Sequence, residues 1–182
     1  QLLFKVTDIE GVLHSFVPNS TVITLPSQFD ILILPVKAYQ VMSVLEQLKP
    51  FIQPRHIIVL LHNGMGTIEK VKKRLPNNPL IAATTSYGAL KLDADTLTET
   101  GLGQTHLGWL SNVDVELKQL IEPILSALLP PSNWHQNIAL ALWNKLAINA
   151  VINPLTAIHN LKNGELAKSK YNTIISNICY EI

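Results

Sequence analysis

The most constraining feature of this chain is a long apolar helical stretch that carries a row of polar side chains. The stretch spans residues 138–158, and apart from that row almost all of its positions are Ala, Leu, Ile, Val or Trp. At about 3.6 residues per turn, Lys145, Asn149 and Asn153 stack along one row of such a helix. A helix that is apolar on most of its surface belongs inside a fold. The row therefore needs polar partners there, because an unpaired buried polar group costs about 2–7 kcal/mol.

A bound polar ligand is one source of partners for this row. Neighbouring main-chain carbonyls are a second source, and the row could instead be the water-facing side of the helix. A membrane-spanning helix is a poor interpretation, although a stretch of about 20 residues is long enough. Lys145, the asparagines and Pro154 all argue against it. Apart from the membrane span, all of these interpretations remain open at this point.

Composition excludes several classes of partner. Hydrophobic residues make up 47% of the 182 residues and charged residues 15%. The formal net charge of +1 gives no general attraction to nucleic acid or to anionic membranes, so we expect neither as a partner. The single cysteine, Cys179, excludes an internal disulfide and fits a cytoplasmic protein. Oligomeric state cannot be predicted from these numbers.

Strand and helix signals alternate through the first two-thirds of the chain. Short apolar runs, typical of strands buried on both faces, occur at residues 29–35, 57–61 and 80–86. Helical periodicity follows the first two runs, at residues 38–48 and 67–75. Alternation at this spacing predicts βαβ crossovers and a parallel sheet. The remaining signals predict a hairpin over residues 2–16, antiparallel strands up to residue 108, and a helix over residues 114–129.

The sequence therefore predicts an α/β fold of two parts. Residues 1–134 are expected to form an incomplete Rossmann-type domain with a parallel sheet, and residues 135–182 the start of an all-α helical domain. Ligands collect at the carboxyl ends of parallel strands, and Lys37, Asn63 and Ala89 follow three successive strand ends. We expect the ligand site to lie where the two domains face each other.

Motif searches give no cofactor or metal signature. Gly64-Met-Gly66 lacks the third glycine of a dinucleotide fingerprint, and Gly101-Leu-Gly103 lies among antiparallel strands. Five of the six histidines are too scattered for a zinc site and are interpreted as ordinary surface or strand residues: His14, His62, His106, His135 and His159. Residue chemistry alone thus predicts a ligand cleft between two domains with an inward lysine.

Four blocks of this sequence resemble the 2-dehydropantoate 2-reductase (ketopantoate reductase) family. They are Pro35-Val-Lys-Ala-Tyr-Gln-Val41, His62-Asn-Gly-Met-Gly-Thr-Ile-Glu69, Leu142-Trp-Asn-Lys-Leu-Ala-Ile-Asn149, and Val151-Ile-Asn-Pro-Leu-Thr-Ala157 with Asn163-Gly-Glu-Leu166. The likeness runs through essentially the whole chain. It implies an oxidoreductase that reduces 2-dehydropantoate to pantoate with NADPH, in pantothenate and coenzyme A biosynthesis. The expected site is a cleft between a Rossmann domain and a helical domain.

The resemblance also implies a chemical role for Lys145, which matches the family's general acid. Reduction of a carbonyl leaves negative charge on its oxygen, and a nearby ammonium can donate the proton. Burial should lower the pKa of this lysine. Pro154 is expected to break the helix locally and to re-aim the turn that follows.

Binding roles are implied in the same way. Asn149, Asn153 and Asn163 match substrate-binding residues, and Asn63 matches a residue that touches both cofactor and substrate. Lys37 and Ala89 match cofactor contacts.

Parts of the family pattern are missing from this sequence. The family's first strand and glycine fingerprint should precede Gln1, and the end of its helical domain should follow Ile182. We therefore expect a fragment with little or no reductase activity by itself; oxidation of NADPH by this segment in the presence of 2-dehydropantoate would contradict that. Two alternatives remain, a non-catalytic remnant or binding module, and a relative that acts on another 2-keto acid.

Overall fold

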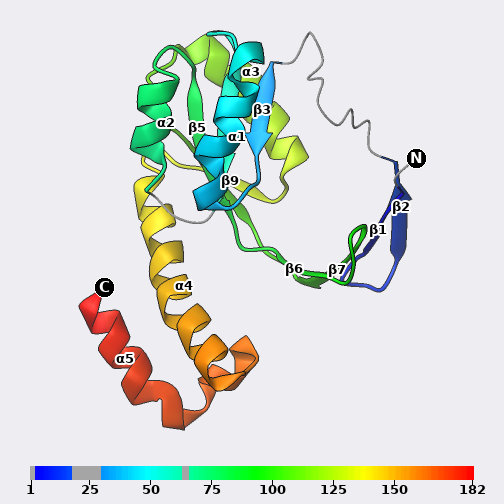
Figure 1. The fold of residues 1–182 in the computed structure, drawn as a ribbon, viewed down its shortest axis with the longest axis vertical. Helices are drawn as coiled ribbons and strands as arrows, with labels where there is room; N and C mark the ends of the chain where they lie inside the picture. Colours follow the sequence, from blue (N-terminus) through cyan, green and yellow to red (C-terminus); the bar gives the residue numbers. More distant parts are fainter. Residues whose placement is uncertain (1–2, 18–29, 63–65) are drawn as a thin grey trace.

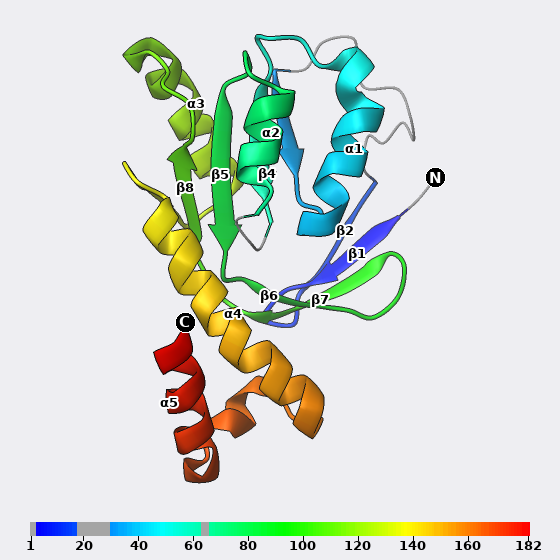
Figure 2. The same ribbon diagram turned by 60° about the vertical axis from the view of Figure 1, so that its left-hand side comes forward.

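The computed structural model describes residues 3–17, 30–62 and 66–182. The strands of these residues form a five-stranded and a four-stranded sheet (Figure 1). A long helix, α4 (Ala139–His159), starts against the larger sheet and extends beyond it (Figure 2). The last helix, α5 (Asn172–Glu181), lies beside the far half of α4 in both views. The predicted order, an α/β part followed by a helical part, is confirmed.

The five-stranded sheet supplies the frame of the molecule. Its strands are β3 (Ile31–Leu34), β4 (Ile57–Leu61), β5 (Leu80–Thr85), β8 (Thr105–Trp109) and β9 (Ser132–Trp134), in the order β3-β4-β5-β8-β9. The strands β3, β4 and β5 are parallel, as their continuous apolar runs predicted. Strand β8 pairs antiparallel to β5, and β9 pairs parallel to β8.

Helices cover both faces of this sheet because alternate strand residues point in opposite directions. On one face lie α1 (Val41–Leu48) and α2 (Ile68–Arg74), packed in a buried cluster of Val41, Leu45, Ile58, Leu60, Val71 and Leu80. On the other face lies α3 (Val115–Leu128), in a cluster of Ile57, Val59, Ile81, Leu107, Ile121 and Leu125. The adjacent residues Ile58 and Val59 thus belong to different clusters.

The residues at the starts of α2 and α3 differ in how they contact the first turn of the helix. Asp114 caps α3, since its carboxylate accepts a hydrogen bond from the main-chain N–H of Leu117 at 2.7 Å. Thr67 immediately precedes α2, but its hydroxyl pairs with Nε2 of His62 at 2.8 Å and makes no cap bond to the helix. Short 3-10 turns flank α1, namely η1 (Ala38–Gln40) and η2 (Lys49–Phe51).

The four-stranded sheet projects from the carboxyl end of β5 (Figure 1). Its strands are β1 (Phe4–Thr7), β2 (Leu13–Phe16), β6 (Gly88–Lys91) and β7 (Thr96–Gly101), in the order β2-β1-β7-β6. Strands β1 and β2 form the predicted hairpin, and β6 and β7 are antiparallel, also as predicted. The chain reaches this sheet after β5 and returns from it into β8.

Two expectations for α4 are wrong. The helix continues through Pro154, because a proline removes a single main-chain hydrogen bond and the neighbours Val151 and Leu155 are held in a buried cluster. The helix is also not buried all round, since Trp143 is 51% and Ile158 75% exposed. Only one side of its far half is covered, by η3 (Asn163–Ala167), η4 (Ser169–Tyr171) and α5. Among the described helices, none has the length and hydropathy needed to cross a membrane.

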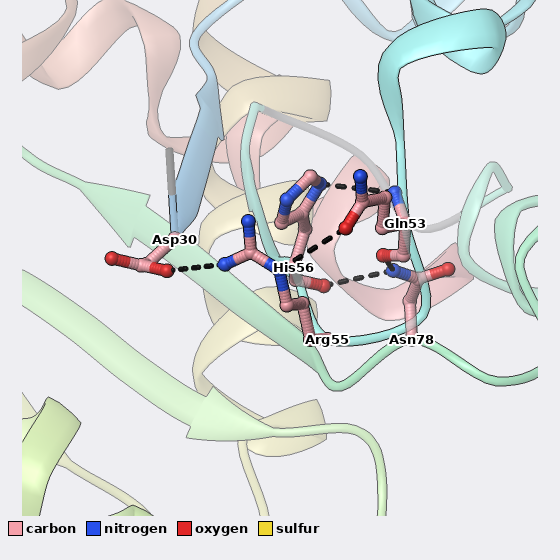
Figure 3. A network of polar contacts seen from close by, with 5 residues as sticks. All are labelled: Asp30, Gln53, Arg55, His56 and Asn78. Atoms are coloured by element: carbon pink, nitrogen blue, oxygen red, sulfur yellow. Dashed lines mark hydrogen bonds and ion pairs between the residues drawn. The ribbon is translucent and has the colours of Figure 1, made fainter. Parts of the chain in front are cut away.

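A polar network closes the amino edge of the parallel strands (Figure 3). Asn78 is 8% exposed, and its Nδ2 donates to the main-chain oxygens of Gln53 at 2.7 Å and His56 at 2.8 Å. Arg55 Nη1 donates to Asp30 Oδ1 at 2.7 Å. His56 accepts at Nδ1 from the Gln53 N–H at 3.0 Å, and burial lowers the pKa of its ring. The loops before β3, β4 and β5 are thereby tied together, on the edge opposite the cavity described below.

Replacing Asn78 by Ala should destabilise the protein by about 1–3 kcal/mol, because the buried main-chain carbonyl of His56 and the part-buried one of Gln53 would lose their donor. The measurement is the urea midpoint of the full-length protein. Asn77→Ala is the matched control, since Asn77 is exposed. Equal midpoints for the two variants would mean that the network contributes nothing to stability.

Candidate active site

A cavity of about 700 Å³ lies at the carboxyl end of β5, between that strand and α4. One wall is formed by Thr84 and Thr85 of β5 and by the turn that follows, up to Gly88. The opposite wall is one side of α4. The carboxyl edge of the sheet is where the sequence placed the ligand site.

The start of α4 is held against the sheet at Gly108. Ile138 and Leu142 pack on Ala82 of β5, and Gly108 of β8 stands directly opposite Ala82 in the strand register. A Cβ atom at position 108 would lie 2.5 Å from Cβ of Ile138. The missing side chain therefore permits the close approach of the first turn of α4. From this contact the helix runs past the end of β5.

The side chain of Lys145 reaches from α4 to the sheet. Its Nζ donates a hydrogen bond to the main-chain oxygen of Thr85, the last residue of β5. Desolvation by burial lowers the pKa of this lysine, the direction predicted from the sequence. Main-chain carbonyl pairing, one of the sources left open above, thus serves one of the three ammonium hydrogens. The other hydrogens are available to a ligand in the cavity.

Three of the predicted asparagines line the same cavity as Lys145. Asn149 and Asn153 follow it on successive turns of α4, and Asn163 is the first residue of η3. The turn η3 is fixed by the Lys162 N–H, which donates to the Glu165 carboxylate at 3.1 Å, and by buried Leu166. Residues that are separated in the sequence of the helical part therefore line the same cavity.

The predicted cofactor residues lie elsewhere or outside the described ranges. Lys37 is exposed after β3, where its main-chain N–H donates to Oε1 of Gln40 at 3.1 Å. Ala89 is exposed on β6. Neither residue lines the cavity. Asn63 falls outside the residues that the structure describes.

Two histidines of this cavity were missed from the sequence. His106 and His135, interpreted above as ordinary residues, both line the cavity, and His106 Nδ1 lies 2.8 Å from His135 Nε2. No sequence signal links them, because their proximity depends on the pairing of β8 with β9. Asn144, the residue before Lys145, also lines the cavity, and its polar side chain within the apolar stretch was the signal that could have found it. Among the described lining residues there is no Asp or Glu.

Comparison with known proteins identifies the family. Residues 4–112 match the family model for ketopantoate reductase PanE/ApbA, and residues 137–182 match the model for its C-terminal part. The chain belongs to the ketopantoate reductase family. The 2-dehydropantoate 2-reductase of Vibrio cholerae is 39% identical over 84% of this chain and 51% of its own length. The chain spans about half the length of the curated relatives it matches.

Solved structures share the fold. A probable 2-dehydropantoate 2-reductase from Bacillus subtilis is 26% identical, with a TM-score of 0.74 over 98% of this chain and 60% of that one. A D-mandelate dehydrogenase, solved with NADH and anilino(oxo)acetate, has a TM-score of 0.80 at 21% identity, over 94% of this chain and 56% of that one. Members of the family with this fold have a Rossmann-like N-terminal domain, as predicted here.

Replacing Gly108 by Ala should destabilise the protein by about 1–3 kcal/mol, because the new methyl group would overlap Ile138 and push α4 from the sheet. Thermal unfolding of the full-length protein measures the change. The control is Gly101→Ala, since an added Cβ there meets nothing within 4 Å. A Gly108 variant as stable as the control would mean that the contact does not hold α4.

Proposed function

We propose that this chain forms the Lys145 side of a 2-dehydropantoate 2-reductase that uses NADPH. The observation that carries the proposal is the half-buried ammonium of Lys145, in a cavity whose wall also holds Asn149, Asn153 and Asn163. Family membership supports it, since relatives with 36–39% identity are 2-dehydropantoate 2-reductases.

The chemistry of the lining suits an anionic 2-keto acid. A lysine and two histidines supply positive charge or N–H donors, and the described lining has no carboxylate to repel the substrate. Amides both donate and accept hydrogen bonds, so the asparagines suit a ligand with carboxylate, carbonyl and hydroxyl groups. In this proposal Asn149, Asn153 and Asn163 orient the substrate, and Asn63 is a further contact for it.

The sheet side of the cavity fits a nicotinamide ring. Thr84 is 3% exposed, lines the cavity, and has no hydrogen-bond partner for its Oγ1 among the described residues. A buried hydroxyl of this kind favours a polar ligand group beside it. We propose that the segment from Thr84 to Gly88 flanks the ring and that Lys37, Asn63 and Ala89 contact other parts of the cofactor. The structural relative with D-mandelate dehydrogenase activity was solved with NADH; the choice of NADPH here follows the family.

In this proposal Lys145 neutralises the negative charge that reduction creates on the substrate oxygen. When bound, the reduced nicotinamide supplies a hydride to the substrate carbonyl carbon. The oxygen of that carbonyl gains negative charge, and Lys145 donates a proton from Nζ to it. A lowered pKa makes this donation easier, and the hydrogen bond to Thr85 keeps the ammonium at the end of β5. The lysine regains its proton from solvent.

Activity measurements would distinguish two other possible functions from the proposed one. A related reductase would prefer another 2-keto acid, which steady-state rates with branched and unbranched 2-keto acids would detect. A non-catalytic binding protein would turn over none of them. A single cysteine suits the reducing cytoplasm, which we propose as the compartment.

Replacing Lys145 by Ala in the full-length protein should lower kcat by about 10²–10⁴-fold, the usual contribution of a general acid. NADPH binding, followed by fluorescence titration, should change little. Lys145→Arg separates charge from proton donation, because guanidinium does not release its proton, and should keep substrate binding but not turnover. Lys73→Ala, an exposed lysine on α2, is the control. Normal turnover in the Lys145→Ala variant would rule out the proposed acid.

A further inference from the structure

The His106–His135 pair is a second ionisable group in the wall that holds Lys145. His106 lies on β8 and His135 follows β9, and their ring centroids are 4.9 Å apart. The 2.8 Å contact joins Nδ1 of His106 to Nε2 of His135. One of these two nitrogens must carry the hydrogen and the other must accept it, because two N–H groups would repel each other. The pair can therefore bind one additional proton, but not two.

The surroundings of the pair make that proton unfavourable while no anion is present. Burial, the neighbouring ring of His135 and the ammonium of Lys145 all lower the pKa of His106. Its strand neighbours are uncharged, since Thr84 of β5 and Asn133 of β9 stand opposite it in register. Tyr87 also lines the cavity, but its hydroxyl donates to Pro130 O at 2.9 Å. The described lining contains no acidic residue that would offset these effects.

A bound carboxylate would make protonation of the pair favourable. An anion within the cavity attracts positive charge, so it favours the protonated pair and the charged lysine together. Thr84 stands directly opposite His106 on the same face of the sheet. Its hydroxyl has no hydrogen-bond partner among the described residues. The polar groups on this wall therefore suit a ligand that accepts hydrogen bonds and carries negative charge.

We propose that the His106–His135 pair is a proton-binding subsite of the cavity, which takes up one proton when a 2-keto acid carboxylate binds. The proton comes from solvent, an N–H bond forms at an outer ring nitrogen of the pair, and no electrons are transferred. The inference rests on the proposed function, because it takes the ligand to be an anionic 2-keto acid. Its consequence is that substrate binding weakens as the pH rises.

The test is the pH dependence of binding by the full-length protein, with oxamate as a stable 2-keto acid analogue and NADP⁺ present. Uptake of one proton predicts that Kd rises tenfold per pH unit above the pKa of the free pair. His135→Gln places an amide near the position of Nε2, and His106→Asn places one near Nδ1. Each single variant still keeps one imidazole that can titrate. The double variant His106→Asn/His135→Gln can keep the hydrogen bond and has no titratable ring in the pair, so its slope of log Kd against pH should fall by one unit.

The control is His159→Gln, an exposed histidine at the end of α4, which should keep the wild-type slope. Calorimetry in buffers of different ionisation enthalpy should show one proton fewer taken up by the double variant. Any slope that comes from Lys145 persists in the double variant. An unchanged slope in the double variant, or no oxamate binding by the wild type, would overturn the inference. These readouts do not depend on turnover, so failure of the linkage is distinguishable from failure of the Lys145 test.

Discussion

The approach of α4 to the sheet at Gly108 is the contact on which the site depends. Ile138 lies where a side chain at position 108 would be, so the helix begins in contact with the strands. Lys145 follows Ile138 by seven residues, and a helix rises about 1.5 Å per residue, so its position is fixed roughly 10 Å further along. At that distance the lysine meets the end of β5, where Thr85 O accepts its hydrogen bond.

The same helix joins three environments. Its first turn packs on the sheet, its far half packs on η3 and α5 through Val151 and Leu155, and its polar row lines the cavity between them. The uniform apolar composition of the stretch conceals this division. Partial burial in the cavity wall has an electrostatic consequence, because desolvation lowers the pKa of Lys145 on α4 and of His106 on β8. The cavity wall therefore holds nitrogen bases whose protons are easily released or regained.

Local sequence was sufficient for most of the elements. The continuous apolar runs before Lys37 and Asn63 predicted parallel strands, because strands buried on both faces need hydrophobic side chains on each. The helix predicted over residues 114–129 is α3, which the carboxylate of Asp114 caps. The prediction failed at Pro154, where packing of the neighbouring residues on both sides outweighs one lost hydrogen bond.

The sequence by itself determined the alternation of strands and helices, the helical row of Lys145, Asn149 and Asn153, and the family likeness. These features depend on periodicity and on short motifs, which are local properties of the chain. Only the tertiary structure decided that His106 meets His135 and that Lys145 meets Thr85. Those pairs are 29 and 60 residues apart in the chain, and they form because strand order and the docking of α4 bring distant segments to one edge of the sheet.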